Sequence, residues 1–158
     1  AIRHSPHLSA IITRGYFERG IMVRPGLQLV ACIFSMMLAG DCHADLSLAW
    51  ATFFGGNGIE RAQGLGVDSL GNVIIVGNTQ STNLPVTAGA LQPAINGTYS
   101  DAYTANISVD GKQLLWATYL GGSREERAYD LTVDSQDNVY VAIWTMSPDF
   151  PTTAGAYD

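Results

Sequence analysis

One stretch of this chain occurs twice, and this repeat limits the possible folds more than any other feature. Residues 50–56, Trp-Ala-Thr-Phe-Phe-Gly-Gly, return as Trp-Ala-Thr-Tyr-Leu-Gly-Gly at 116–122, an offset of 66 residues. The same offset aligns residues 84–90 with 150–156 without any gap between the two blocks. Each copy is therefore expected to form one structural unit that buries apolar surface against its neighbour.

Each unit carries the signals of an antiparallel all-β structure. Short runs of β-branched and aromatic residues predict four strands, at 63–67, 72–77, 102–109 and 114–120. Asp68-Ser69-Leu70-Gly71 joins the first two, and Asp110-Gly111 joins the last two, where it favours a type I′ turn. Four antiparallel strands at a fixed period are typical of a β-propeller blade, so the fold class is predicted to be all-β with four-stranded blades. A β-sandwich is the alternative.

The N-terminal part has the layout of a secretory signal peptide at 22–44. A basic start at Arg24 precedes an apolar run at 27–39, which ends in small residues. This run is shorter than the ~20 residues of a membrane span, so no stable span is expected once the signal is removed. A buried core helix is the alternative. Residues 1–21 are expected to precede the true start at Met22 and to lack structure, and residues 45–158 to form about one and a half blades of an incomplete ring.

Composition excludes several functions for the part of the chain that follows this signal. Cysteine and histidine occur only before residue 45, which removes the usual partners of a Ser or Cys nucleophile and the commonest zinc ligands. We therefore expect no enzyme, no cofactor and no metal. Residues 45–158 hold twelve carboxylates against four basic side chains, and an acidic surface repels the phosphates of nucleic acids.

Three blocks of the second copy resemble a known family. They are Ala-Thr-Tyr-Leu-Gly-Gly-Ser at 117–123, Val-Asp-Ser-x-x-Asn-Val-Tyr-Val at 133–141 and Phe-Pro-Thr-Thr-Ala-Gly-Ala at 150–156. Together they are similar to the bacterial seven-bladed β-propeller repeat family, often called SBBP. The resemblance implies a secreted or cell-surface protein whose blades pack on neighbouring blades of a longer parent. Asp137 stands where that family has glycine. The 133–139 block is also similar to NHL-type propellers, some of which are enzymes.

Loop positions indicate where a ligand could bind. Because antiparallel strands alternate in direction, the connections 55–62, 78–100 and 121–128 are expected at one end of the blades. The second is far longer than the typical ~4–6 residues, which is common in functional loops. The charged residues of the other two connections are the candidate ligand-binding set: Glu60, Arg61, Arg124, Glu125, Glu126 and Arg127.

A structural role is the alternative for each of these charged residues, either in ion pairs between blades or in capping loop amides. The glutamates supply too few oxygens for a calcium ion, which needs six to eight. Asp68 and Asp134 are expected to cap hairpin turns, and Trp50 and Trp116 to pack between blades.

The expected function is that of an exported or cell-surface scaffold that binds a protein or glycan without catalysis. One alternative is a carbohydrate-active or NHL-like propeller enzyme, since paired carboxylates can cleave glycosides. The other is a structural surface spacer.

Overall fold

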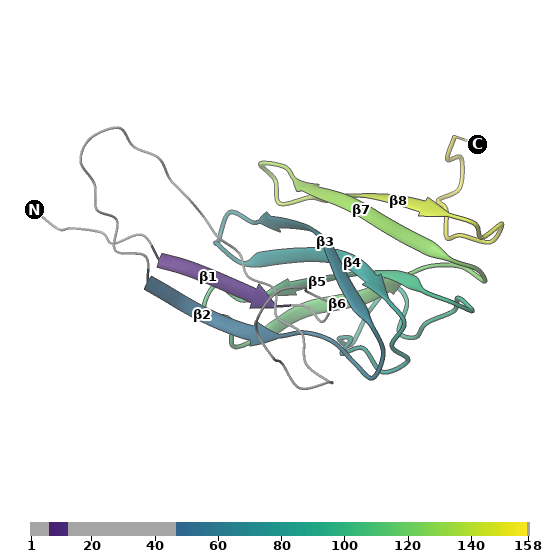
Figure 1. Cartoon of the computed structure of the whole chain (residues 1–158). Coiled ribbons are helices and arrows are strands. Elements are labelled where there is room, and N and C mark those ends of the chain that lie inside the picture. Colours follow the sequence, from purple (N-terminus) through teal and green to yellow (C-terminus); the bar gives the residue numbers. More distant parts are fainter. Residues whose placement is uncertain (1–6, 13–46, 158) are drawn as a thin grey trace, which may run out of the picture.

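A computed structural model describes residues 7–12 and 47–157 of the chain. The predicted signal peptide at 22–44 and most of the segment 1–21 lie outside these residues. The described strands are β1 (His7–Ile12), β2 (Ser47–Phe53), β3 (Glu60–Val67), β4 (Val73–Thr79), β5 (Asp101–Ile107), β6 (Leu114–Leu120), β7 (Glu126–Val133) and β8 (Val139–Thr145) (Figure 1). Since these ranges contain no helix, the all-β class is confirmed, and no helix in them could cross a membrane.

Strands β3, β4, β5 and β6 form a four-stranded antiparallel sheet in chain order, called the central sheet below. They coincide with the four strands predicted for the first unit, although β3 begins three residues earlier and β5 ends two residues earlier than expected. Ile75, in the middle of β4, pairs with Leu65 on one side and Ala105 on the other. None of the described sheets closes on itself.

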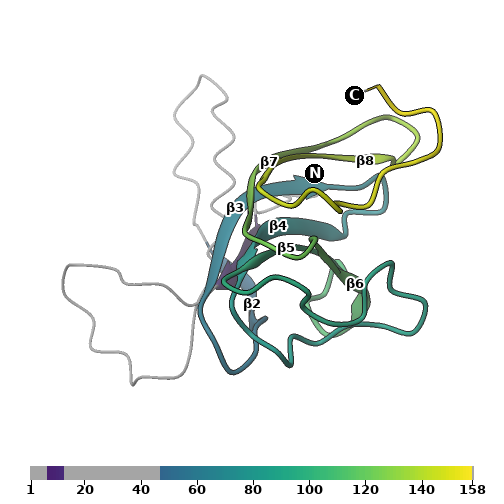
Figure 2. The ribbon, with the colours of Figure 1, turned by 90° about the vertical axis from the view of Figure 1, so that its right-hand side faces the viewer.

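The central sheet is covered on both faces, so that β4 and β5 are almost entirely buried. On one face, Ile75, Tyr103 and Tyr119 pack with Phe54 and Leu84 in a first core, to which Trp50 of β2 adds its ring. The other face forms a second core against the C-terminal hairpin, β7–β8, which lies along this face in Figures 1 and 2. Burial of apolar side chains on both faces is the main source of stability for this stack.

Strand β1 was not predicted from the sequence. It pairs in parallel with β2, from His7 beside Ser47 to Ile12 beside Phe53. Strand β2 is equivalent to β6, because residues 66 apart occupy equivalent places in the two copies. Its Trp50 donates a hydrogen bond from Nε1 to the carbonyl oxygen of Val109 (2.7 Å).

Glycines on β3 allow the C-terminal hairpin to approach closely. A Cβ atom on Gly64 would lie 2.9 Å from the backbone nitrogen of Leu131, and one on Gly66 would lie 2.7 Å from the Leu131 Cδ1 atom. The equivalent positions on β7 hold Asp130 and Thr132. The outward face of β7 therefore differs in shape from the face of β3 that receives the hairpin.

The predicted turn at Asp110-Gly111 exists, but it is not of type I′. Gly111 has φ +72°, whereas Asp110 lies outside the positive-φ region. The amide of Gly111 donates to the carbonyl of Ser108, and the Ser108 amide donates to the carbonyl of Gln113. The connection is thus a longer loop than the two-residue turn that the sequence favoured, because the strand pairing already stops at Ile107 and Leu114.

Candidate functional site

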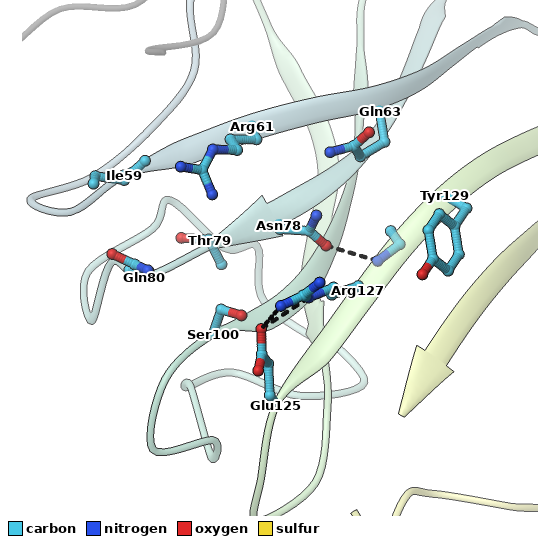
Figure 3. A pocket seen from close by; sticks show the side chains of 11 residues that line it. Ile59, Arg61, Gln63, Asn78, Thr79, Gln80, Ser100, Glu125, Arg127 and Tyr129 are labelled. Carbon is cyan, nitrogen blue, oxygen red and sulfur yellow. Dashed lines mark hydrogen bonds and ion pairs between the residues drawn. The ribbon is translucent and has the colours of Figure 1, made fainter. Parts of the chain in front are cut away.

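The candidate site is a groove between the central sheet and the C-terminal hairpin. Its volume is about 340 Å³, and it lies where β7 passes the ends of β3 and β4 (Figure 3). Both copies of the repeat contribute to its walls. The polar side chains among its lining residues are Arg61, Gln63, Asn78, Thr79, Gln80, Ser100, Glu125, Arg127 and Tyr129.

Arg127 lines the groove and is held in place by two neighbouring side chains. Its Nε and Nη2 atoms lie 2.9 Å and 2.8 Å from Oε1 of Glu125. Its guanidinium carbon also lies 5.5 Å from the ring centre of Trp144 on β8. Because this ion pair is partly exposed, it adds at most about 1 kcal/mol of stability. Its larger effect is to fix the guanidinium and to neutralise its charge.

Arg61 has no such partner within the described part of the chain. It is the equivalent of Arg127, but Ile59 stands at the position that Glu125 occupies in the second copy. Its side chain is exposed and lines the groove, and Figure 3 shows its guanidinium extending from β3 toward Thr79 at the end of β4. The groove therefore carries one positive charge that no carboxylate of the described residues offsets.

Asn78 links the two copies at the centre of the groove. Its Oδ1 atom accepts a hydrogen bond of 2.6 Å from the amide of Ala128 (Figure 3). An asparagine amide has two N–H donors besides its oxygen, so the Nδ2 group remains available on the groove side. Gln63 and Tyr129 hold equivalent positions on β3 and β7 and line the same space.

Glu60 lies outside the groove, in a buried hydrogen-bonded cluster. Its Oε1 atom accepts hydrogen bonds from the hydroxyls of Thr79 (2.9 Å) and Ser81, and its Oε2 atom accepts one from the amide of Gly56 (3.3 Å). The Ser81 hydroxyl oxygen in turn accepts the amide of Gly58 at 2.7 Å. This cluster, called the glutamate clasp below, ties the loop before β3 to the end of β4.

Glu126 forms the same clasp 66 residues later. Its Oε1 atom accepts hydrogen bonds from Thr145 (2.7 Å) and Ser147, and the Ser147 hydroxyl oxygen accepts the amide of Arg124 at 2.8 Å. Both glutamates are fully buried. Glu126 Oε2 lacks a hydrogen-bond partner among the described residues. Two copies of one buried arrangement indicate a structural role.

Asp101 is a further buried carboxylate beside the second clasp. Burial raises its pKa, although hydrogen bonds from the amides of Asn96 (2.9 Å) and Gly97 (2.9 Å) and from Gln92 (2.7 Å) oppose the rise. The charge of Glu126 raises the pKa further. These bonds fasten the long connection between β4 and β5 to the sheet, so the side chain is engaged in the fold.

Of the six predicted site residues, some line the groove and others do not. Arg61, Glu125 and Arg127 meet in the groove, whereas Glu60 and Glu126 are enclosed in their clasps. Arg124 is not among the lining residues, and its amide belongs to the second clasp. The prediction from the sequence missed Gln63, Asn78, Ser100 and Tyr129. Gln63 and Tyr129 lie within strands whose sequence gives no sign that they border a cavity, whereas Asn78 and Ser100 bound the connection 78–100, which was expected at this end of the blades.

The groove offers hydrogen-bond donors, one uncompensated cation and an aromatic ring. Within the described ranges, no three side chains of His, Cys, Asp or Glu are placed to hold a metal ion. Glu125, the carboxylate that lines the groove, is engaged by Arg127. This set of groups is suited to binding a polar ligand.

Comparison with protein-family models gave no match to this chain, and comparison with curated proteins gave none either.

Proposed function

We propose that this chain belongs to an exported or cell-surface repeat protein and binds a ligand, without catalysis, in the groove between successive repeat units. The observation that carries the proposal is the convergence of Arg61, Asn78 and Arg127, from both copies, on one cavity. A groove between units is a common place for ligands, because walls from two elements can enclose more of the ligand than one surface can.

We further propose that the units are blades of a β-propeller of the SBBP type. The four-stranded antiparallel central sheet, covered on both faces, supports this architecture. Trp50 and Trp116 support it as well, since each packs from a fourth-strand position against the next core. In such a protein, neighbouring blades of the parent would cover the remaining faces.

The clasps argue against the enzyme alternative. A glycosidase needs two carboxyl groups that both reach the substrate, whereas Glu60 and Glu126 are fully buried and bound to hydroxyls of Thr and Ser. The groove favours a binding module over a structural spacer, because a spacer has no need of an uncompensated arginine in a cavity. Export rests on the predicted signal peptide at 22–44.

The proposal can be tested by ligand screening with variants of the groove. The full chain would be screened against glycans and peptides by ligand-observed NMR, and Gln63→Trp, which fills the groove, would be compared with Gln136→Trp, which places the same ring at an exposed distant turn. We expect Gln63→Trp to weaken binding about 10-fold or more, a loss of about 1.4 kcal/mol, and Gln136→Trp to leave binding unchanged.

Two results would contradict the proposed function. Binding that is insensitive to Gln63→Trp would place the ligand elsewhere on the molecule. Release of a cleaved or modified product during prolonged incubation, followed by chromatography, would show catalysis.

A further inference from the structure

The geometry points to a saccharide that bears a carboxylate, such as a uronic acid unit, as the ligand of the groove. This inference rests on the proposed function and adds the chemical class of the ligand. It starts from a difference between two equivalent arginines, Arg61 and Arg127, of which only the second has an acidic partner in the described structure.

The difference has a simple cause in the sequence. In the second copy, Glu125 precedes Arg127 by two residues and binds its guanidinium, while in the first copy Ile59 precedes Arg61 by the same spacing. Ile59 is 44% exposed and lines the groove beside Arg61. A guanidinium without a protein carboxylate presents a planar fork of donors, which matches a ligand carboxylate in a bidentate arrangement.

The charge balance favours a ligand group with a single negative charge. Arg127 is neutralised by Glu125, so Arg61 supplies the one net positive charge among the described lining residues. Residues 45–158 as a whole carry eight more acidic than basic side chains, and this surface disfavours polyanions and phosphate dianions. A carboxylate carries one charge at neutral pH and meets both conditions.

The remaining walls of the groove favour a sugar ring around this carboxylate. Gln63, Gln80 and the Nδ2 group of Asn78 offer amide hydrogens to hydroxyl groups, and Figure 3 shows these side chains around one space. Tyr129, which is 59% exposed, adds an aromatic face with a hydroxyl at its edge. Ile59 and Ala128 are the other apolar lining residues, so the groove lacks the deep apolar pockets that anchor peptide side chains.

The test compares a free acid with its neutral ester in the full chain. Galacturonic acid, which carries one carboxylate, and its methyl ester have the same sugar ring and differ by that single charge, and binding of both would be measured by isothermal titration calorimetry. We expect the free acid to bind at least about 10-fold more tightly than the ester, because a hydrogen-bonded charge pair contributes more than neutral hydrogen bonds. The difference should shrink at high salt.

The sharpest variant is Ile59→Glu, which copies the Glu125–Arg127 pair into the first copy. It leaves Arg61 in place but offsets its charge, so the preference for the free acid should be lost. Arg61→Gln should have the same effect, and Arg124→Gln, which removes an exposed cation outside the lining, should have none. Because Ile59 and Arg61 are exposed, thermal melts should show that all three variants remain folded.

Equal binding of acid and ester, or an unchanged preference in Ile59→Glu, would overturn the carboxylate assignment. Tighter binding of an acetylated and amidated Ala-Glu-Ala peptide, which also carries one carboxylate, than of galacturonic acid would overturn the saccharide assignment. In either case, the proposed function would stand if Gln63→Trp still blocks the ligand that binds, and it would fall with the inference if that variant has no effect.

Discussion

Asp137 shows how one residue can serve a turn and a contact between copies at once. It has φ +64° at the position where the first copy has Gly71 with φ +81°. Its amide donates to the carbonyl of Asp134 as that of Gly71 donates to Asp68, so the turn is preserved despite the side chain. Its carboxylate accepts hydrogen bonds from the amide (2.8 Å) and hydroxyl (2.6 Å) of Ser69. The side chain that makes the left-handed conformation of Asp137 unfavourable is therefore the same one that joins the β7–β8 hairpin to the β3–β4 hairpin.

A double-mutant cycle can separate these two effects. Asp137→Gly removes the left-handed strain, which is of the order of 1 kcal/mol, but it also removes the bonds to Ser69. Ser69→Ala removes the hydroxyl bond to Asp137 but keeps the amide bond. We therefore expect Asp137→Gly to change the free energy of unfolding little in the native background and to be more favourable in Ser69→Ala by about 0.5–1.5 kcal/mol, the contribution of one hydrogen bond, as measured by urea denaturation. Equal effects in both backgrounds would show that the hydroxyl bond adds no stability.

At the scale of elements, the junction between β3 and β7 depends on glycine for steric reasons. A methyl group at Gly64 would press on the backbone nitrogen of Leu131, which cannot move without the strand, while one at Gly66 would meet the ends of the Leu131 and Val133 side chains. Backbone is less able to yield than the tip of a side chain. A side chain should therefore be harder to accommodate at Gly64 than at Gly66.

We expect Gly64→Ala to lower the free energy of unfolding by about 1–3 kcal/mol, the usual cost of overpacking, and Gly66→Ala to cost less. Urea denaturation of both variants measures the difference. Combination of Gly66→Ala with Leu131→Ala, which removes the side chain that the new methyl would meet, is the matched control and should recover part of the loss caused by Leu131→Ala. A greater loss for Gly66→Ala than for Gly64→Ala would contradict this account of the junction.

At the scale of the whole molecule, the described chain is a stack of sheets held together by two cores and a few hydrogen bonds between copies. Asn78 binds the amide of Ala128, Ser69 binds Asp137, and the carbonyl of Ser100 accepts the amide of Glu126 (3.0 Å). The C-terminal hairpin contacts the central sheet through one face, whereas the central sheet is packed on both. The hairpin is thus the part that should open first.

A substitution of Trp116 can test whether the C-terminal hairpin opens before the central sheet, because this side chain packs from β6 against the second core. We expect Trp116→Ala to lower the free energy of unfolding by about 2–4 kcal/mol and to speed hydrogen exchange of the β7 and β8 amides more than that of the β4 and β5 amides. Trp144→Ala, which removes a ring that is 41% exposed, is the control and should change exchange little. Equal loss of protection in all four strands after Trp116→Ala would show one cooperative unit.

The sequence by itself determined the strands of the central sheet and the turns at 68–71 and 134–137, because strand and turn preferences arise between residues close in the chain. The repeat also predicted that Trp50 and Trp116 occupy equivalent packing positions, which the two cores confirm. The prediction of a type I′ turn at Asp110-Gly111 was wrong. The length of this loop depends on where the pairing of β5 with β6 ends, which the two turn residues alone do not specify.

Only the tertiary structure decided which charged residues are exposed. Glu60 and Arg61 are neighbours in the sequence, yet one is buried in a clasp and the other faces the groove, because alternate residues of a strand point to opposite sides. The sequence shows that Ile59 stands where the second copy has Glu125. This difference affects the charge of the groove only because the packing of one copy on the other places Arg61 and Arg127 in the same cavity. Burial and the sharing of a cavity depend on contacts between distant residues, which local sequence preferences do not specify.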